Sequence, residues 1–394
     1  MNSTRRNVGL LAACQAMLMS TNATLIAING LAGLALAPVK AIATLPVTCY
    51  VIGAAASTML ASLHMKRVGR QRGLALGTLW SVAGALVCGT AIGVQSFWLL
   101  CAGALVLGVY NAYGQYYRFA AADAATPEFR STAISLVLAG GLVGGILGPS
   151  LSRLTIDALT PHFLGGYLTL IVFALVSFFL LQFLRIPAPS ASEQAGSGRP
   201  LSEIAAQPAF VVAVLSAAIG YGVMNFLMVS TPIAMQICGH PYGDAAFVIS
   251  SHVIAMFAPS FLTGPLIRRA GTLPVMFTGA VLNLMAIGVA LSGIAVAQFW
   301  VALVLLGVGW NFLYIGGTTL LTTTYRPEER AKVQGANDQT IFIVMVLSSF
   351  TSGMTVTTAG WERVNLAALP LVAIVAAAII WFALHLRTHK AAAA

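Results

Sequence analysis

The residues best suited to chemistry form a polar row inside one apolar stretch, residues 107–130. Asn111, Gln115 and Arg118 follow one another at spacings of four and three, so they share one face of a helix. Arg118 lies nine residues before Pro127, about 13 Å inside the helix end. A guanidinium at that depth in a membrane costs roughly 2.5–3.5 kcal/mol, so it must face a partner charge, a bundle interior or water. We expect Arg118 either to contact a polar ligand or to tie helix ends together.

A second row lies on the first apolar stretch, where Gln15, Asn22 and Asn29 are seven residues apart each time. That spacing places them on one helix face, and an amide row facing lipid would be costly. We expect these amides to line a cavity; the alternative is that they hydrogen-bond neighbouring helices. Three tyrosines are expected to widen the face that carries Arg118: Tyr110, Tyr113 and Tyr117.

The second half of the chain offers aromatic and amide groups at helical spacing. They are Trp310, Asn311 and Tyr314 on one stretch, and Tyr221 and Asn225 on another. Rings stack on flat molecules and amides fix orientation, so these groups suit a planar, partly polar organic ligand. Aromatic packing in the core is the alternative interpretation.

Few titratable groups lie within the apolar stretches. Asp338 is about eight residues inside its stretch and Asp123 is near the end of another. A lone aspartate in lipid is protonated or paired, so we expect Asp338 to pair with Arg118 or with another base. His252 is the other candidate, although a satisfied core histidine is the more frequent outcome.

Composition sets the class of protein to which these stretches belong. The chain is 59% hydrophobic and 8% charged, with a mean hydropathy of +0.90, whereas soluble proteins carry about 25% charged residues. The apolar stretches are typically about 20 residues or longer, which is enough to cross a bilayer as helices. The sequence therefore predicts an all-α polytopic membrane protein.

Twelve such spans are expected. Their ranges are 8–33, 38–63, 73–93, 97–125, 131–152, 163–184, 209–236, 243–267, 273–295, 297–324, 331–357 and 364–386. Sixteen Lys and Arg residues fall on one side of this arrangement, and only Lys40, Arg153 and Arg363 on the other. Because positive charge stays inside, both termini are expected in the cytoplasm and the protein in the inner membrane of a bacterial cell.

The spans are duplicated. Gly69 and Gly271 lie in similar basic loops 202 residues apart, and Pro127 and Pro327 open similar Pro-Glu-x-Arg motifs 200 residues apart. Two landmarks with nearly one offset indicate an internal repeat in parallel topology. Residues 186–208, rich in Pro, Ser, Ala and Gly, are the expected cytoplasmic linker. It would separate two six-helix bundles, residues 1–185 and 209–394.

The loop after the second span carries a basic motif made of Lys66, Arg67, Gly69 and Arg70. With the twelve spans and the repeat, this loop resembles the G-x-x-x-D-[RK]-x-G-R-[RK] pattern of the major facilitator superfamily, although Lys66 replaces the usual aspartate. The run Gly140 to Pro149, GGLVGGILGP, is similar to a pattern of the drug/proton antiporters in that family.

The resemblance implies a secondary transporter that moves a small organic solute by alternating access. We expect a proton as the coupling ion, and the glycine run favours efflux; uptake of a planar nutrient such as a flavin-like vitamin, or uncoupled transport, are the alternatives. The amide and aromatic groups above would bind substrate. The candidates for gating or proton coupling are Arg118, Asp123, Asp338 and His252.

Other functional classes lack their motifs in this sequence. No nucleotide-binding loop, zinc-protease motif or nucleophile elbow occurs, so we expect neither an enzyme nor direct ATP drive. The five cysteines form no C-x-x-C pair, and neither a metal nor a cofactor is expected. The net charge of +10 lies in loops between spans, which argues for membrane lipids rather than nucleic acid as the partner. A monomer suffices, because the cavity is expected within one chain.

Overall fold

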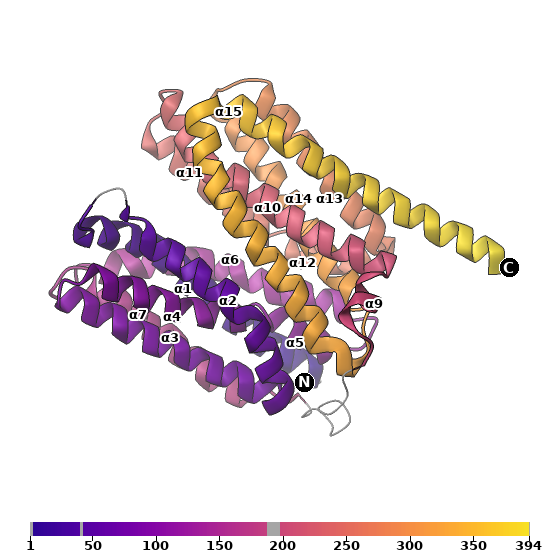
Figure 1. The fold of residues 1–394 in the computed structure, drawn as a ribbon, viewed down its shortest axis with the longest axis horizontal. Helices are drawn as coiled ribbons and strands as arrows, with labels where there is room; N and C mark the ends of the chain where they lie inside the picture. The colour runs from indigo at the N-terminus through magenta and orange to yellow at the C-terminus, as the bar shows by residue number, and fades with distance from the viewer. Residues whose placement is uncertain (1–2, 40–41, 187–197, 394) are drawn as a thin grey trace. The chain divides into compact units, whose positions relative to one another are not determined.

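The computed structural model describes residues 3–39, 42–186 and 198–393. These residues form helices and no strands, which confirms the predicted all-α membrane fold (Figure 1). The helices are α1 (Ser3–Leu36), α2 (Leu45–Val68), α3 (Arg70–Gly93), α4 (Phe97–Gly114), α5 (Tyr117–Asp123), α6 (Arg130–Thr155), α7 (Leu164–Gln182), α9 (Leu201–Ala205), α10 (Pro208–Ile237), α11 (Tyr242–Phe257), α12 (Ser260–Ala270), α13 (Thr272–Leu291), α14 (Val296–Leu321), the 3₁₀ turn η2 (Pro327–Glu329) and α15 (Arg330–Ala393).

Eleven helical segments of the described chain are long and apolar enough to cross a membrane. The expected fourth and eighth spans are each broken in two, as α4 with α5 and α11 with α12. The last segment holds the expected eleventh and twelfth spans, because α15 contains Gly360 at φ 81° and ψ 174°. That conformation is open to glycine and interrupts the helix, and Figure 1 shows α15 turning back on itself.

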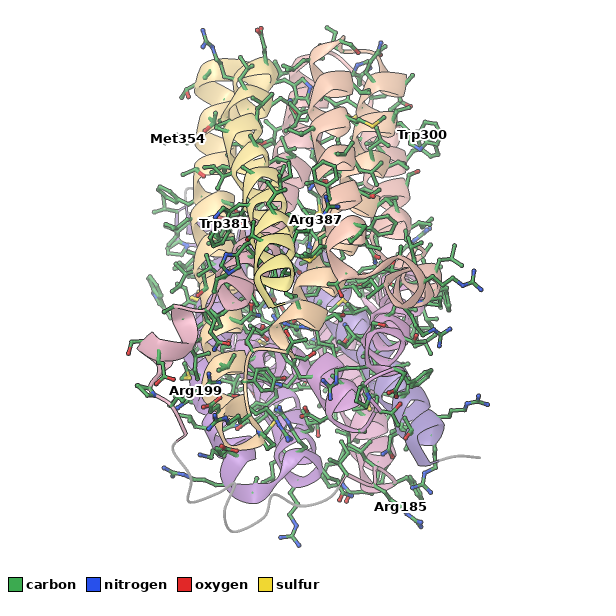
Figure 2. The ribbon with its side chains drawn as sticks, turned by 90° about the vertical axis from the view of Figure 1, so that its right-hand side faces the viewer. Arg185, Arg199, Trp300, Met354, Trp381 and Arg387 are labelled. Atoms are coloured by element: carbon green, nitrogen blue, oxygen red, sulfur yellow. The ribbon has the colours of Figure 1, made fainter. Side chains whose placement is uncertain are left out.

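Large apolar side chains cover the outside of these helices, as expected in lipid. In Figure 2 Trp300 of α14 and Met354 and Trp381 of α15 lie on the outer surface, and all three are exposed. Water would disfavour such a surface, whereas acyl chains solvate it. The outward side chains therefore agree with a membrane-spanning chain.

The described chain divides into two compact units. Unit 1 takes in Met1–Pro127, Leu136–Ser197 and Pro327–Gln339, and unit 2 takes in Glu128–Ser135, Gly198–Arg326 and Thr340–Ala394. Each unit thus holds most of one expected bundle and a short piece from the other half of the sequence. Residues 187–197 of the expected linker lie outside the described residues, and α9 follows them.

The two glycines that mark the repeat have the same unusual backbone. Gly69 has φ 90° and ψ 157°, and Gly271 has φ 91° and ψ 160°. Each ends one helix and begins the next, at α2–α3 and at α12–α13. Because L side chains rarely adopt this conformation, the shared geometry explains glycine at both positions.

The start of α15 packs on α2 in unit 1. Ser62 of α2 donates a hydrogen bond to the carbonyl oxygen of Ala331 at 2.8 Å. One turn further along, a Cβ on Gly335 would lie 2.6 Å from the sulfur of Met59 and 3.4 Å from the Cβ of Ser62. A side chain at this position would displace the end of Met59, so glycine allows the close approach without that shift.

The start of α6 makes the corresponding contact with α12 in unit 2. Here the glycine is Gly264, whose added Cβ would lie 2.8 Å from the Cβ of Ser135. The Oγ of Ser135 accepts from Gly264 N at 3.0 Å and donates to the carbonyl oxygen of Ser260. By the repeat, Ser135 corresponds to Gly335 and Gly264 to Ser62, so the serine and the glycine have exchanged helices.

The glycine run of the fifth expected span has a packing role. Ideal Cβ atoms on Gly140, Gly144 and Gly148 of α6 would lie 2.1, 2.3 and 2.6 Å from carbonyl oxygens of α1. Small residues at a spacing of four let two helix backbones approach closely. The run is thus explained within unit 1 by the contact between α1 and α6, whatever the direction of transport.

Candidate functional site

The polar row predicted on the fourth span is connected by hydrogen bonds in unit 1. Asn111 Oδ1 accepts from Gln115 Nε2 at 3.2 Å and from Asn22 Nδ2 at 3.4 Å. Gln115 Oε1 accepts from Arg118 Nη1 at 3.3 Å. The structure therefore brings together four of the predicted residues, one from α1 and three from the α4–α5 region.

Arg118 ends this row in an ion pair with Asp338. The Nη2 of Arg118 lies 2.5 Å from Asp338 Oδ1, and both side chains are 1% exposed. Asn337 Nδ2 donates to the same carboxylate oxygen at 2.8 Å, and the guanidinium lies over the ring of Phe119 at 4.4 Å. The pair expected from the sequence is present, and it joins the start of α15 to α5 inside unit 1. Its roles in gating and proton coupling stay predictions.

The break between α4 and α5 explains the position of Arg118. Residues 115 and 116 form a turn between the two helices, and Arg118 Nη1 donates to the freed carbonyl oxygen of Gln115 at 2.7 Å. A buried carbonyl without a partner would cost about 1–3 kcal/mol. Arg118 thus stabilises the helix break and neutralises Asp338 with one side chain.

Two members of this network were not expected from the sequence. Tyr50 of α2 donates its hydroxyl hydrogen to Asn22 Oδ1, and Asn337 supports Asp338. Tyr50 lies near the middle of the expected span 38–63, but no second polar residue three or four positions away marked its face for a hydrogen bond to Asn22. Asn337 is the sequence neighbour of Asp338, and this adjacency is the feature of the sequence that could have predicted their hydrogen bond.

The remaining amides of the first span are placed differently. Asn29 is buried and its Oδ1 accepts from the hydroxyl of Tyr167 of α7 at 2.7 Å. This bond agrees with the alternative that the row holds helices together. Gln15 is buried one heptad before Asn22. Substrate contact by Gln15 and Asn29 remains a prediction.

The tyrosines of the fourth span differ in their surroundings. Tyr110 and Tyr117 are almost fully buried. Tyr113 forms a hydrogen bond of 2.7 Å between its hydroxyl and His64 Nδ1 of α2. An ideal Cβ on Gly77 of α3 would lie 2.6 Å from its ring. Tyr113 is thus held by α2 and α3, whereas the sequence predicted that it would widen the Arg118 face.

A second charged cluster involves the basic loop motif of unit 1. Asp123 Oδ2 pairs with Arg70 Nε at 3.1 Å and with Arg330 Nη1 at 3.2 Å, and Arg70 also donates to Gln334. Arg70 of the motif therefore has a carboxylate partner in Asp123 of α5. Arg67 and Lys66 lie beside it at the end of α2, and Gly69 makes the turn.

Unit 2 holds the predicted aromatic cluster. The rings of Trp310 and Tyr314 are stacked with centroids 5.0 Å apart, and Tyr221 meets them edge-on at 5.3 and 5.4 Å. Phe257 meets Trp310 edge-on, with ring centroids 5.8 Å apart. Trp310 and Tyr314 are buried and Tyr221 is half-buried, so Tyr221 presents the accessible ring of this cluster.

The amides of unit 2 are committed to helix contacts. Asn311 donates to Met256 O and Ser260 Oγ, and accepts from Thr263 Oγ1, each at 2.6 Å. It thereby supports the break between α11 and α12. Asn225 of α10 donates to two serine hydroxyls of α15, at 2.7 and 2.9 Å. These bonds supply a structural role for both residues; their contact with substrate stays a prediction.

His252 fits the interpretation of a core residue. It is fully buried in α11, and its Nδ1 lies 2.6 Å from the carbonyl oxygen of Leu303 in α14. Since a carbonyl oxygen only accepts, Nδ1 carries the hydrogen. No group of three or more metal-binding side chains occurs within the described ranges.

These features define an integral, multi-pass α-helical membrane protein with a buried charge pair at a helix break. A model of the Major Facilitator Superfamily matches residues 8–349 and 214–394. The chain belongs to this superfamily and is a transporter of a small molecule.

Individual relatives agree with this assignment. Riboflavin transporter RfnT of Brucella anthropi is 40% identical over 392 residues, which cover 99% of this chain and 98% of that protein. Among solved structures, the human organic anion transporter MFSD10 (TETRAN) matches with a TM-score of 0.79 at 14% identity, over 96% of this chain and 100% of that one. The E. coli fucose:proton symporter FucP matches with a TM-score of 0.78 at 16% identity, over 96% and 99%. The two structural matches show a shared fold.

Proposed function

We propose that this protein transports a flavin, with riboflavin as the substrate, and that it moves the flavin into the cell. The observation that carries the proposal is the 40% identity to a riboflavin transporter along 99% of the chain. The prediction of a planar, partly polar solute, drawn from aromatic and amide residues, is compatible with this substrate.

The chemistry of each unit supports a flavin. An isoalloxazine ring is flat, with an apolar edge and an edge of carbonyl and ring nitrogen atoms. Tyr221 of unit 2 offers an accessible ring beside two buried ones, which suits stacking. The amides Asn22, Asn111 and Gln115 of unit 1 offer hydrogen bonds to the polar edge.

Uptake by growing cells tests the proposal. The gene is expressed in a bacterial strain that neither makes nor imports riboflavin, and growth and entry of labelled riboflavin are measured at limiting vitamin. We expect growth and saturable entry, which excess unlabelled riboflavin abolishes. Release of preloaded riboflavin without entry would instead support efflux. If the cells show no entry and no release of riboflavin, the proposal that this protein transports riboflavin is refuted.

We further propose that protons drive transport through Asp338. Its carboxylate is buried against Arg118, so a proton arriving there would remove the charge that holds the pair together. In proteoliposomes an inward proton gradient should accelerate riboflavin entry by the wild type. Asp338→Asn should abolish this acceleration and retain exchange of labelled for unlabelled riboflavin. Acceleration that is unchanged in Asp338→Asn would exclude the proton role.

We also propose that both termini face the cytoplasm of a bacterial cell and that the inner membrane is the location. The distribution of Lys and Arg supports this orientation. Fusions of alkaline phosphatase, which is active only outside the cytoplasm, should be active after Gly93 and inactive after Val68. The opposite pattern would reverse the orientation.

A further inference from the structure

The hydrogen bonds of the polar row determine which atom of each amide faces which neighbour. A guanidinium only donates, so Gln115 must direct Oε1 toward Arg118. Its Nε2 then faces Asn111 and donates to Oδ1 at 3.2 Å. The charge of Arg118 therefore fixes the orientation of Gln115, and Gln115 in turn fixes that of Asn111.

Asn22 has the matching orientation on the other side of Asn111. Its Nδ2 donates to Asn111 Oδ1 at 3.4 Å and its Oδ1 accepts from the hydroxyl of Tyr50, a group that can serve either atom of the amide. Asn111 Oδ1 now receives two hydrogen bonds, which is the capacity of a carbonyl oxygen. Within the part of the chain that the structure describes, the Nδ2 of Asn111 donates to no group.

Asn111, at the centre of the row, therefore has an Nδ2 group that can donate a hydrogen bond to a ligand. Asn111 is 7% exposed, and its Nδ2 keeps some accessible surface. Asn22 and Gln115 on either side are only half-buried, so a ligand atom can reach the row. At Asn111 the row therefore offers an N–H group to a ligand.

We propose that Asn111 selects the substrate by donating to an acceptor atom on its ring system, a carbonyl oxygen or an unprotonated ring nitrogen. The inference rests on the proposed transport of a flavin, whose pyrimidine edge carries such acceptors. Arg118, Gln115, Asn22 and Tyr50 act on this contact as positioning residues, because they hold the Asn111 amide with its nitrogen outward.

Riboflavin binding to the purified full-length protein tests the proposal, measured by quenching of flavin fluorescence. Asn111→Leu removes the donor and should weaken binding about tenfold. Asn111→Asp replaces N–H groups by oxygen and should weaken it at least as much. Gln115→Glu keeps an oxygen that accepts from Arg118, but it replaces the N–H donor that faces Asn111 by a second oxygen acceptor. The Asn111 amide would then rotate to donate to this oxygen, and its own oxygen, not its nitrogen, would face the ligand. We expect about tenfold weaker binding here too, whereas Gln182→Glu, a matched change at an exposed site of α7, should have no effect.

Competition by lumichrome, the flavin ring without its ribityl chain, locates the contact. Asn111→Leu should weaken lumichrome and riboflavin by the same factor. A loss confined to riboflavin would place the contact on the ribityl chain and overturn the inference, as would folded Asn111 variants that bind like the wild type. Monodisperse gel filtration and an unchanged helical circular dichroism signal establish folding. Absence of riboflavin binding by the wild type would refute the proposed function itself.

Discussion

Removing the carboxylate of Asp338 tests the buried ion pair most directly. Asp338→Leu replaces the carboxylate by a larger apolar group and leaves a guanidinium that is 1% exposed without its counter-charge. Removing one partner of a buried pair costs about 3–5 kcal/mol, because the remaining charge is no longer compensated. Asp338→Asn keeps an oxygen that can accept from Arg118, so we expect a smaller loss of about 1.5–3 kcal/mol.

Replacing both partners should restore most of the stability. In Arg118→Met with Asp338→Leu no charge is buried, and exchange of an ion pair for apolar residues is often neutral. The carbonyl oxygen of Gln115 also loses its donor in this variant, which costs about 1 kcal/mol or more. We therefore expect a double variant about 1–2 kcal/mol below the wild type, well above Asp338→Leu alone.

Unfolding in mixed micelles, followed by circular dichroism, measures these free energies. Arg153→Met, at an exposed position of α6, serves as the control for loss of an arginine. The two single effects and the double effect form a thermodynamic cycle. Effects that add to within about 0.5 kcal/mol would mean that Arg118 and Asp338 do not stabilise one another, and would refute the reasoning.

Three further predictions concern other contacts. Gly144→Leu should prevent the close contact of α6 with α1 and abolish stable expression, whereas Gly288→Ala, where a Cβ meets nothing within 4 Å, should express normally in the same membrane fractions. Asp123→Asn should speed or slow riboflavin exchange at least threefold without loss of protein, since it removes one charge from two ion pairs; unchanged exchange kinetics would contradict a gating role. Asn311→Leu should lower the free energy of unfolding by about 2–4 kcal/mol, because three buried hydrogen bonds are lost, and a change below 1 kcal/mol would show that the break between α11 and α12 does not need it.

The sequence predicted the features of this structure that follow from placing the chain in lipid: the membrane spans and the pairing of a buried charge. Apolar length predicted the spans. The cost of an isolated charge in lipid predicted a partner for Asp338, with Arg118 or another base as the candidates, and the partner is Arg118, 220 residues away in the sequence. Such arguments work because few charged residues lie inside the membrane, so few pairings are available.

Features that depend on what opposes a side chain could not be read from the chain. Asn111 and Asn311 occupy equivalent positions in the repeat, yet Asn311 has its hydrogen bonds filled by α11 and α12 while Asn111 keeps a donor. The difference comes from Ser260 and Thr263, which the helix break brings next to Asn311. Spacing gives the face of a helix on which a residue lies, but not the partner on the neighbouring helix.

The exchanged serine and glycine of the two helix starts bear on how such a duplicated protein can change. At both places, Ser62 with Gly335 and Ser135 with Gly264, a serine of one helix faces a glycine of the other, and a Cβ on the glycine would lie 3.4 and 2.8 Å from the serine Cβ. The feature common to the two sites is the combined size of the pair, one serine and one glycine. Which of the two helices carries the serine differs between the sites. Aligning the copies then shows two mismatches where the physical constraint has stayed the same.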